Sequence, residues 1–191
     1  MRIYLFLLTI IACSFVINKP IDRIGVKGPF TFNEKIFNIA SADKPRDNYY
    51  IQEYLPEQET VEHFNQMLTI HLFVVDISLK DAVQKKINEL DLRKKSDPTC
   101  NYKVSQSPDG KEFIVDFLLG EHKGDKMTIA EFNIYRYRQI KIKGNKSAIL
   151  VFSYSKRAYG DEITSFYEKL GTNRKNLLNE IITIGMPTLN I

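Results

Sequence analysis

The clearest pattern of apolar positions in this chain is a helical stripe that begins just after Ser78. Four apolar residues recur at intervals of three or four: Leu79, Val83, Ile87 and Leu90. This spacing places them on one face of a helix, and Ser78 is a favourable residue for its N-cap. The pattern therefore predicts a helix over about 78–95, stopped by Pro98, with its apolar stripe against a core.

A second helical pattern extends over about 161–184. Its apolar residues fall on one stripe: Ile163, Phe166, Leu170, Leu177, Ile181 and Ile184. Gly171 interrupts the stripe and predicts a break between two helical segments, while Gly185 and Pro187 end it. We expect this region to pack its stripe against the same sheet as the first helix.

Between the two helical patterns the apolar residues alternate, which is typical of strands. Strands are predicted over 111–119, 127–142 and 148–154, joined by short turns, and they form an antiparallel meander over 111–155. The last of these strands is apolar on both faces, as expected for a central strand.

The N-terminal half gives a mixed pattern. A strand or hairpin arm is predicted over 30–37, a polar loop over 41–48 and a strand over 49–55 that ends at Pro56. Thr60 then predicts the N-cap of a short helix. A buried strand follows over 68–75 and contains His71, which we expect near the core or on the second face of the sheet.

These elements predict the α+β class, with an antiparallel sheet packed against helices at about 78–95 and 161–184. Residues 19–191 have a natural size for a single domain. A chain of this length buries roughly 70% of its unfolded surface, so it does not require a metal or a disulfide to fold.

The order of elements across about 49–184 resembles the PsbP-like α+β sandwich. In that fold an antiparallel sheet is covered by helices. The stretches from Glu53 to Glu57 and from Met67 to Thr69 are also similar to segments of uncharacterised exported bacterial proteins. The resemblance implies an architecture and no activity, because one fold can host many functions.

Residues 1–18 have the three parts of a secretory signal peptide. Arg2 supplies a charge, an apolar run from Tyr4 to Ala12 follows, and small residues come next. The run is shorter than the roughly 20 apolar residues that span a bilayer. We therefore expect export of residues 19–191 to the periplasm or cell envelope of a bacterium.

Cys13 allows an alternative to a freely soluble product. Ile10, Ile11, Ala12 and Cys13 are similar to a lipobox, in which Cys13 would carry a lipid and anchor the protein to a membrane. The apolar run continues beyond Cys13, where a polar tether is usual, so the two interpretations stay open. If Cys13 is removed or acylated, Cys100 has no internal disulfide partner.

The charge of the chain does not indicate a nucleic-acid partner. There are 27 Lys and Arg against 23 Asp and Glu, a net charge of +4. Such a mild excess of positive charge is far from the strongly basic surface that nucleic-acid binding needs. We also expect no cofactor, since no cofactor motif is present.

Two basic segments are candidate ligand contacts. In the predicted strand over 127–142, Arg136 and Arg138 share one face with isoleucines, and Lys141 and Lys143 share the other face with Tyr135 and Tyr137. Cations beside rings or aliphatic side chains suit an anionic ligand or an acidic protein surface, although long basic side chains also occur on ordinary exposed sheet faces. Arg157 and Tyr159 lie where a loop is expected to lead into the last helix, and loops often carry function.

Glu59, Glu62 and His63 are an alternative site. On a helix they would share a face, where they could hold a metal or pair a base with a histidine. Acidic residues are also favourable at a helix start, and only one histidine is present. We expect an exported, non-enzymatic binding or accessory domain that binds an envelope protein or an anionic ligand; a hydrolase or metal-dependent enzyme is the alternative.

Overall fold

A computed structural model describes residues 20–191 of the chain. The predicted signal peptide and Cys13 lie outside the described residues, and the prediction of export stays untested. The prediction that residues 19–191 form a single domain is untested as well.

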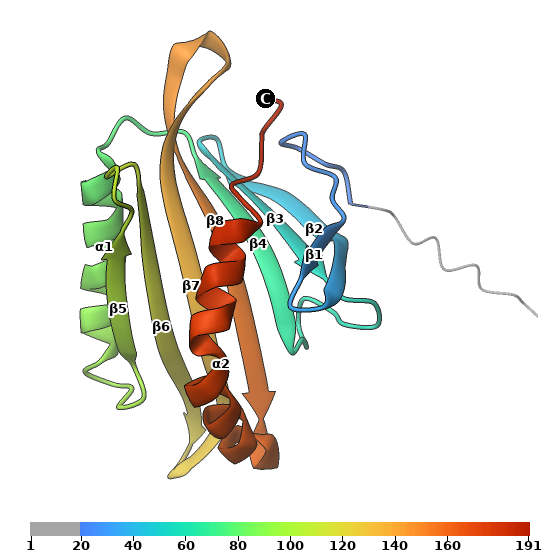
Figure 1. The fold of residues 1–191 in the computed structure, drawn as a ribbon, viewed down its shortest axis with the longest axis vertical. Coiled ribbons are helices and arrows are strands. Elements are labelled where there is room, and N and C mark those ends of the chain that lie inside the picture. The colour runs from blue at the N-terminus through green and yellow to red at the C-terminus, as the bar shows by residue number, and fades with distance from the viewer. Residues whose placement is uncertain (1–19) are drawn as a thin grey trace, which may run out of the picture.

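The described chain is built around one antiparallel sheet of eight strands in the order β1-β2-β3-β4-β8-β7-β6-β5 (Figure 1). The strands are β1 (Phe30–Phe32), β2 (Lys35–Arg46), β3 (Tyr49–Leu55), β4 (Gln66–Phe73), β5 (Asn101–Gln106), β6 (Glu112–Lys123), β7 (Lys126–Ile142) and β8 (Lys146–Tyr159). The helices are α1 (Leu79–Arg93) and α2 (Ile163–Thr183), with two short 3₁₀ turns, η1 (Lys143–Asn145) and η2 (Gly160–Glu162).

The predicted α+β class is wrong, because the sheet dominates the fold. Strands account for 46% and helices for 24% of the structure. The prediction undercounted the strands at both edges of the sheet. β2 continues to Arg46 through the segment expected to be a loop, and β5 forms where no strand was expected. Both are largely exposed edge segments, and in β5 only Tyr102 and Val104 alternate with polar residues, which is too short a pattern to indicate a strand.

The face of the sheet under α2 carries the larger core. Alternate residues of β4, β8 and β7 point to this face and meet the apolar stripe of α2. The buried residues include Leu68, Ile70, Leu72, Leu150, Phe152, Tyr154, Phe132 and Ile134 from the strands and Phe166, Leu170, Leu177 and Ile181 from α2. The segment before β1 and the C-terminal tail complete the cover, since the amide of Asn190 donates to the carbonyl of Ile24 at 2.9 Å.

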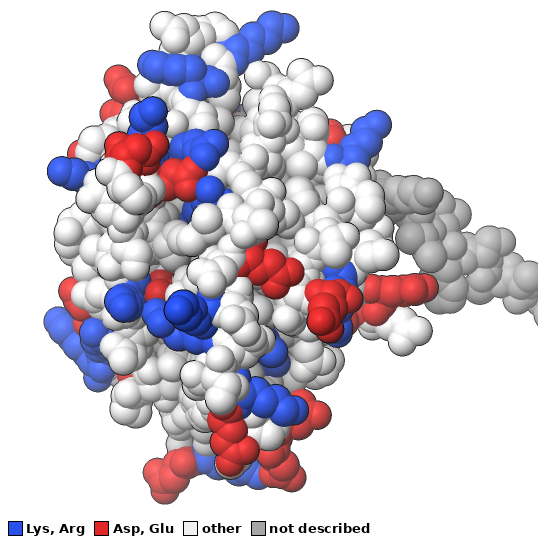
Figure 2. Space-filling model, viewed as in Figure 1, with Lys and Arg blue, Asp and Glu red and all other residues white. Residues whose placement is uncertain are grey.

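An ion pair fixes α2 to the sheet beside this core. Arg174 of α2 donates from Nε to the carboxylate of Asp116 on β6 at 2.9 Å. Asp116 is buried, and a buried carboxylate requires such a partner. Acidic and basic side chains are intermixed over this side of the molecule (Figure 2), so it does not present a patch of one sign to a partner.

α1 lies on the opposite face, over one side of the sheet (Figure 1). Its N-cap is Ser78 as predicted, and the Ser78 hydroxyl accepts a hydrogen bond from the amide of Asp81. Leu79, Val83 and Leu90 pack in a cluster with Val115, Phe117 and Tyr137 from β6 and β7. α1 therefore covers the β5–β7 side, and the face of β8, β4 and β3 extends beyond it.

Two details of the predicted helices are wrong. No helix starts at Thr60; the chain makes a loop in which the backbones of Thr60 and His63 exchange hydrogen bonds of 3.1 and 3.2 Å. α2 continues through Gly171 without a break. A glycine inside a helix costs about 1 kcal/mol, and the buried apolar residues of α2 on both sides of Gly171 outweigh that cost.

Candidate ligand-binding site

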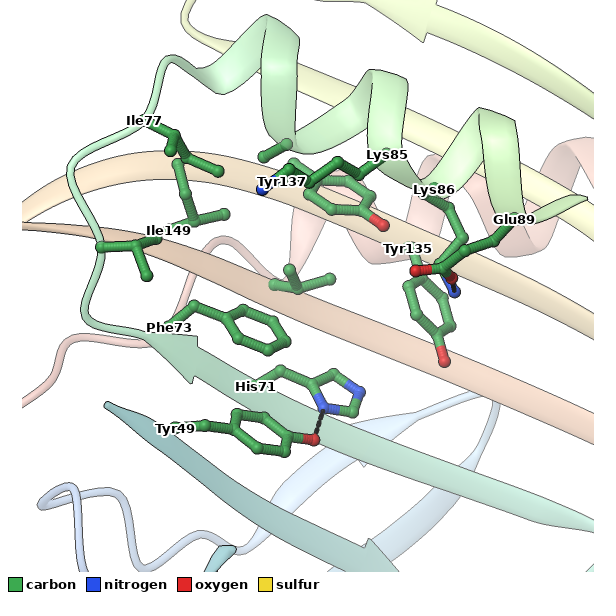
Figure 3. A pocket seen from close by; sticks show the side chains of 13 residues that line it. Tyr49, His71, Phe73, Ile77, Lys85, Lys86, Glu89, Tyr135, Tyr137 and Ile149 are labelled. Carbon is green, nitrogen blue, oxygen red and sulfur yellow. Dashed lines mark hydrogen bonds and ion pairs between the residues drawn. The ribbon is translucent and has the colours of Figure 1, made fainter. Parts of the chain in front are cut away.

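A cavity of about 350 Å³ lies between α1 and the part of the sheet that α1 does not cover (Figure 3). Its volume falls in the range of small-molecule sites, roughly 300–1,000 Å³. The sheet contributes Tyr49, His71, Phe73, Tyr135, Tyr137, Ile149 and Val151; α1 and the segment before it contribute Val75, Ile77, Ala82, Lys85, Lys86 and Glu89.

The strand register brings the sheet residues together. Tyr49 pairs with Phe73 across β3 and β4, and Val151 of β8 pairs with both His71 and Tyr137. Directly paired residues in antiparallel strands point to the same face of the sheet. The register therefore builds one continuous floor from strands that lie far apart in the sequence.

The floor of the cavity is aromatic. The rings of Tyr49 and Phe73 stack with centroids 4.6 Å apart and an interplanar angle of 2°. The His71 ring lies 5.8 Å from the ring of Tyr135. Each ring of the stacked pair covers one face of the other, so the pair offers a ligand its edges and outer faces.

His71 supplies a polar atom on this floor. The Tyr49 hydroxyl and His71 Nδ1 are hydrogen-bonded at 2.9 Å. Burial, with a further contribution from the charge of Lys86, lowers the pKa of His71 to about 4. The imidazole is therefore neutral at pH 7. Its Nε2 atom makes no hydrogen bond with another residue in the described part of the chain, and the ring lies on the cavity floor in Figure 3.

The phenols of the cavity also stay neutral. Burial raises the pKa of Tyr135 and of Tyr137 above the ordinary value of a phenol, and burial likewise raises the pKa of Tyr49. Their hydroxyls keep their protons at every physiological pH. The sheet side of the cavity thus combines aromatic area with uncharged hydrogen-bonding groups.

The charged groups of the cavity come from α1. Lys86 Nζ forms an ion pair of 2.7 Å with Glu89 and lies 5.2 Å from the centroid of the Tyr135 ring. Lys85 adds a second ammonium at the exposed edge. Two lysines against one glutamate leave this wall with a net positive charge.

Arg136 has a structural position on the other face of β7. It is 6% exposed, and its Nη1 donates to the carbonyls of Ile181 at 2.7 Å and Ile182 at 3.0 Å, in the last turn of α2. It also forms an ion pair of 2.7 Å with Glu112. Arg138 pairs with the same carboxylate. A guanidinium at a helix C-terminus is favourable to the helix dipole.

Arg157 and Tyr159 lie on the opposite face from these two arginines. Arg157 pairs with Glu131, and its guanidinium carbon lies 4.1 Å from the centroid of the Phe64 ring. The Tyr159 hydroxyl donates to the carbonyl of Phe64 at 2.8 Å, which holds the loop before β4. Both residues belong to β8, in place of the loop expected there.

The structure does not bring the four predicted contacts together. Arg136 and Arg138 face α2, whereas the register of β7 and β8 puts Arg157 beside Glu131 on the other face. The residues that line the cavity beside α1 include none of the four.

Glu59, Glu62 and His63 do not share a helix face, because the helix is replaced by a loop. One oxygen of Glu59 accepts hydrogen bonds from the amides of Asn65 and Gln66, at 2.8 and 3.0 Å. His63 stacks on the ring of Tyr159 at 4.4 Å. Within residues 20–191, no group of three or more His, Cys, Asp and Glu side chains is arranged to hold a metal.

The fold is thus an antiparallel sheet with one covered face and one face that holds an aromatic cavity. Residues 24–186 match the model of an uncharacterised protein family, and the chain belongs to this family. The match gives no support to a relationship with PsbP-like proteins specifically. No curated protein matches the chain. None of the helices in residues 20–191 has the length and apolar content needed to span a membrane.

Proposed function

We propose that this chain is an exported binding domain and that the cavity beside α1 is its ligand site. The observation that supports the proposal is the cavity itself: a concave aromatic floor with few polar groups, which is the usual composition of a small-molecule site. The aromatic side chains of the floor favour a ligand with an aromatic body, and His71 Nε2 offers it a hydrogen bond.

The export part of the proposal rests on residues 1–18. Mass spectrometry of the mature N-terminus from a bacterial envelope fraction tests it. A start between residues 14 and 19 supports a cleaved signal peptide, and an acylated Cys13 supports a lipid anchor. A chain recovered from the cytoplasm with Met1 in place contradicts export.

The binding part can be tested with N-phenylnaphthylamine, an uncharged planar probe that fluoresces in apolar surroundings. Ala82 lines the cavity, so Ala82→Phe places a ring inside it. Gln84 is on the exposed side of α1, so Gln84→Phe adds the same ring outside the cavity. We expect saturable binding to the wild type and to Gln84→Phe, and at least about tenfold weaker binding to Ala82→Phe, because the probe loses its apolar contacts.

Circular dichroism of each variant shows whether it is folded. Probe binding that is equal in the two phenylalanine variants would place the probe elsewhere and contradict the assignment of this cavity as the site.

A further inference from the structure

The charged side chains of α1 at the cavity, Lys85, Lys86 and Glu89, indicate which charge the ligand carries. We infer that the cavity binds an aromatic molecule that carries one anionic group, with the anion at Lys86 and the body against the aromatic side chains of the floor. This inference rests on the proposed function and goes further, because it names the charge of the ligand and the residue that recognises it.

The first argument is the position of Lys86. Its ammonium lies 5.2 Å from the ring centroid of Tyr135 and 5.7 Å from that of Phe117, so it is held over the aromatic wall and not extended into solvent. Its side chain is only 23% exposed. In Figure 3 Lys86 and Glu89 lie close together beside Tyr135.

The second argument is that the present partner of Lys86 is easily exchanged. Glu89 is 65% exposed, and an ion pair with so exposed a carboxylate is weak. An anion inside the cavity would meet the same ammonium in a less hydrated place, where a charge-assisted hydrogen bond is stronger. Lys86 can therefore turn from Glu89 to a ligand without leaving a buried charge unpaired.

The third argument is the charge of the other side chains that line the cavity. Lys85 adds positive charge at the edge of the cavity, while Tyr49, His71 and Tyr135 are uncharged at pH 7. A cationic ligand would meet two ammonium groups with only Glu89 to balance them. An anionic ligand meets a net attraction, so the charges discriminate between the two.

The test uses two probes that share one aromatic body. Anilinonaphthalene sulfonate is the anionic counterpart of N-phenylnaphthylamine, so the comparison isolates the sulfonate. Lys86→Gln removes the proposed anion contact. Lys80→Gln is the matched control, because Lys80 is exposed on the same helix and does not line the cavity. Glu89→Gln releases Lys86 from its competing carboxylate.

We expect Lys86→Gln to weaken binding of the sulfonate by about tenfold to a hundredfold, the effect of one charge-assisted hydrogen bond, and to weaken binding of the uncharged probe far less. Lys80→Gln should change neither, and Glu89→Gln should tighten binding of the sulfonate alone. Equal effects of Lys86→Gln on both probes, or equal effects of Lys86→Gln and Lys80→Gln on the sulfonate, would overturn the inference while leaving the cavity as a binding site. If neither probe binds the wild type saturably, the proposed function fails, and the inference fails with it.

Discussion

The two faces of the sheet are covered to different extents. Under α2, the apolar residues of β4, β8 and β7 are sealed by the helix, the segment before β1 and the C-terminal tail. Under α1, the cover stops over β5–β7, and aromatic side chains with polar ends line a cavity. The same strands supply both faces, so the difference comes from how far each helix and its neighbours extend.

The comparison separates stability from binding. The α2 face uses buried charges to fix a helix in place: Arg136 holds the end of α2, and Arg174 holds its middle. On the α1 face, the charges of Lys86 and Glu89 lie at the edge of the cavity and are paired weakly. Substitutions on the two faces should therefore have different consequences.

The largest expected effect on stability comes from a substitution on the face under α2. Arg136→Met removes the guanidinium that donates to the carbonyls of Ile181 and Ile182, and it removes one partner of Glu112. Removing one partner of a buried ion pair costs about 3–5 kcal/mol, so urea unfolding should show a loss of about 3 kcal/mol or more. Arg138→Met is the control, since this more exposed partner of Glu112 should cost less than about 1 kcal/mol. Equal losses in the two variants would contradict the structural role of Arg136.

The next effect is a pH dependence of stability that arises from His71, on the face under α1. The folded pKa of His71 is about 4 against an ordinary value of 6.5, so the unfolded chain binds more protons at this group between those values. Wild-type stability should therefore fall as the pH drops from about 6.5 to 4. The contribution is about 3 kcal/mol for a shift of this size, and it is fully present above pH 6.5.

His71→Gln removes this titration, so its free energy of unfolding should fall less than that of the wild type between pH 7.5 and pH 4. Urea unfolding at both pH values measures the difference. His122→Gln is the control, because His122 is exposed at the β6–β7 turn. Parallel pH profiles for wild type and His71→Gln would show that His71 is not buried as a neutral group.

The smallest expected effect on stability concerns the N-caps of the two helices. The Ser78 side chain caps α1, whereas Glu162 makes no side-chain cap for α2. Ser78→Ala should lower the free energy of unfolding by about 1 kcal/mol. Glu162→Ala should lower it less, and thermal unfolding of both variants distinguishes the two helices. An unchanged free energy of unfolding in Ser78→Ala would mean that the Ser78 hydroxyl does not stabilise α1.

Much of the local structure could be predicted from the sequence. The stripe from Leu79 to Leu90 located α1, and the apolar run within β8 indicated its central place between β4 and β7. The edge strand β5 was missed because its apolar alternation is limited to Tyr102 and Val104, which are only partly buried. The helix predicted to start at Thr60 was wrong because acidic residues near backbone amides are favourable in a loop as well as at a helix start. Here Glu59 accepts hydrogen bonds from the amides of Asn65 and Gln66 in a loop.

The candidate site could not be assembled from the sequence. Successive residues of a strand point to opposite faces of the sheet. This alternation places Tyr135 and Tyr137 on the face away from Arg136, and it places His71 on the face away from Leu72. Which strands are neighbours is a long-range property, and it decides that β3, β4, β7 and β8 share one floor. The arginines were the more visible signal in the sequence, yet Arg136 binds the end of α2 and Arg157 binds Glu131.

The central claim is that the ligand site lies on the α1 face and that α2 buries the core of the other face. Chemical-shift mapping during a titration with N-phenylnaphthylamine tests it most directly. We predict that the largest shifts occur at Tyr49, His71, Tyr135 and the α1 residues from Ala82 to Glu89. Shifts centred on α2 or the C-terminal tail, with the cavity residues unchanged, would contradict it.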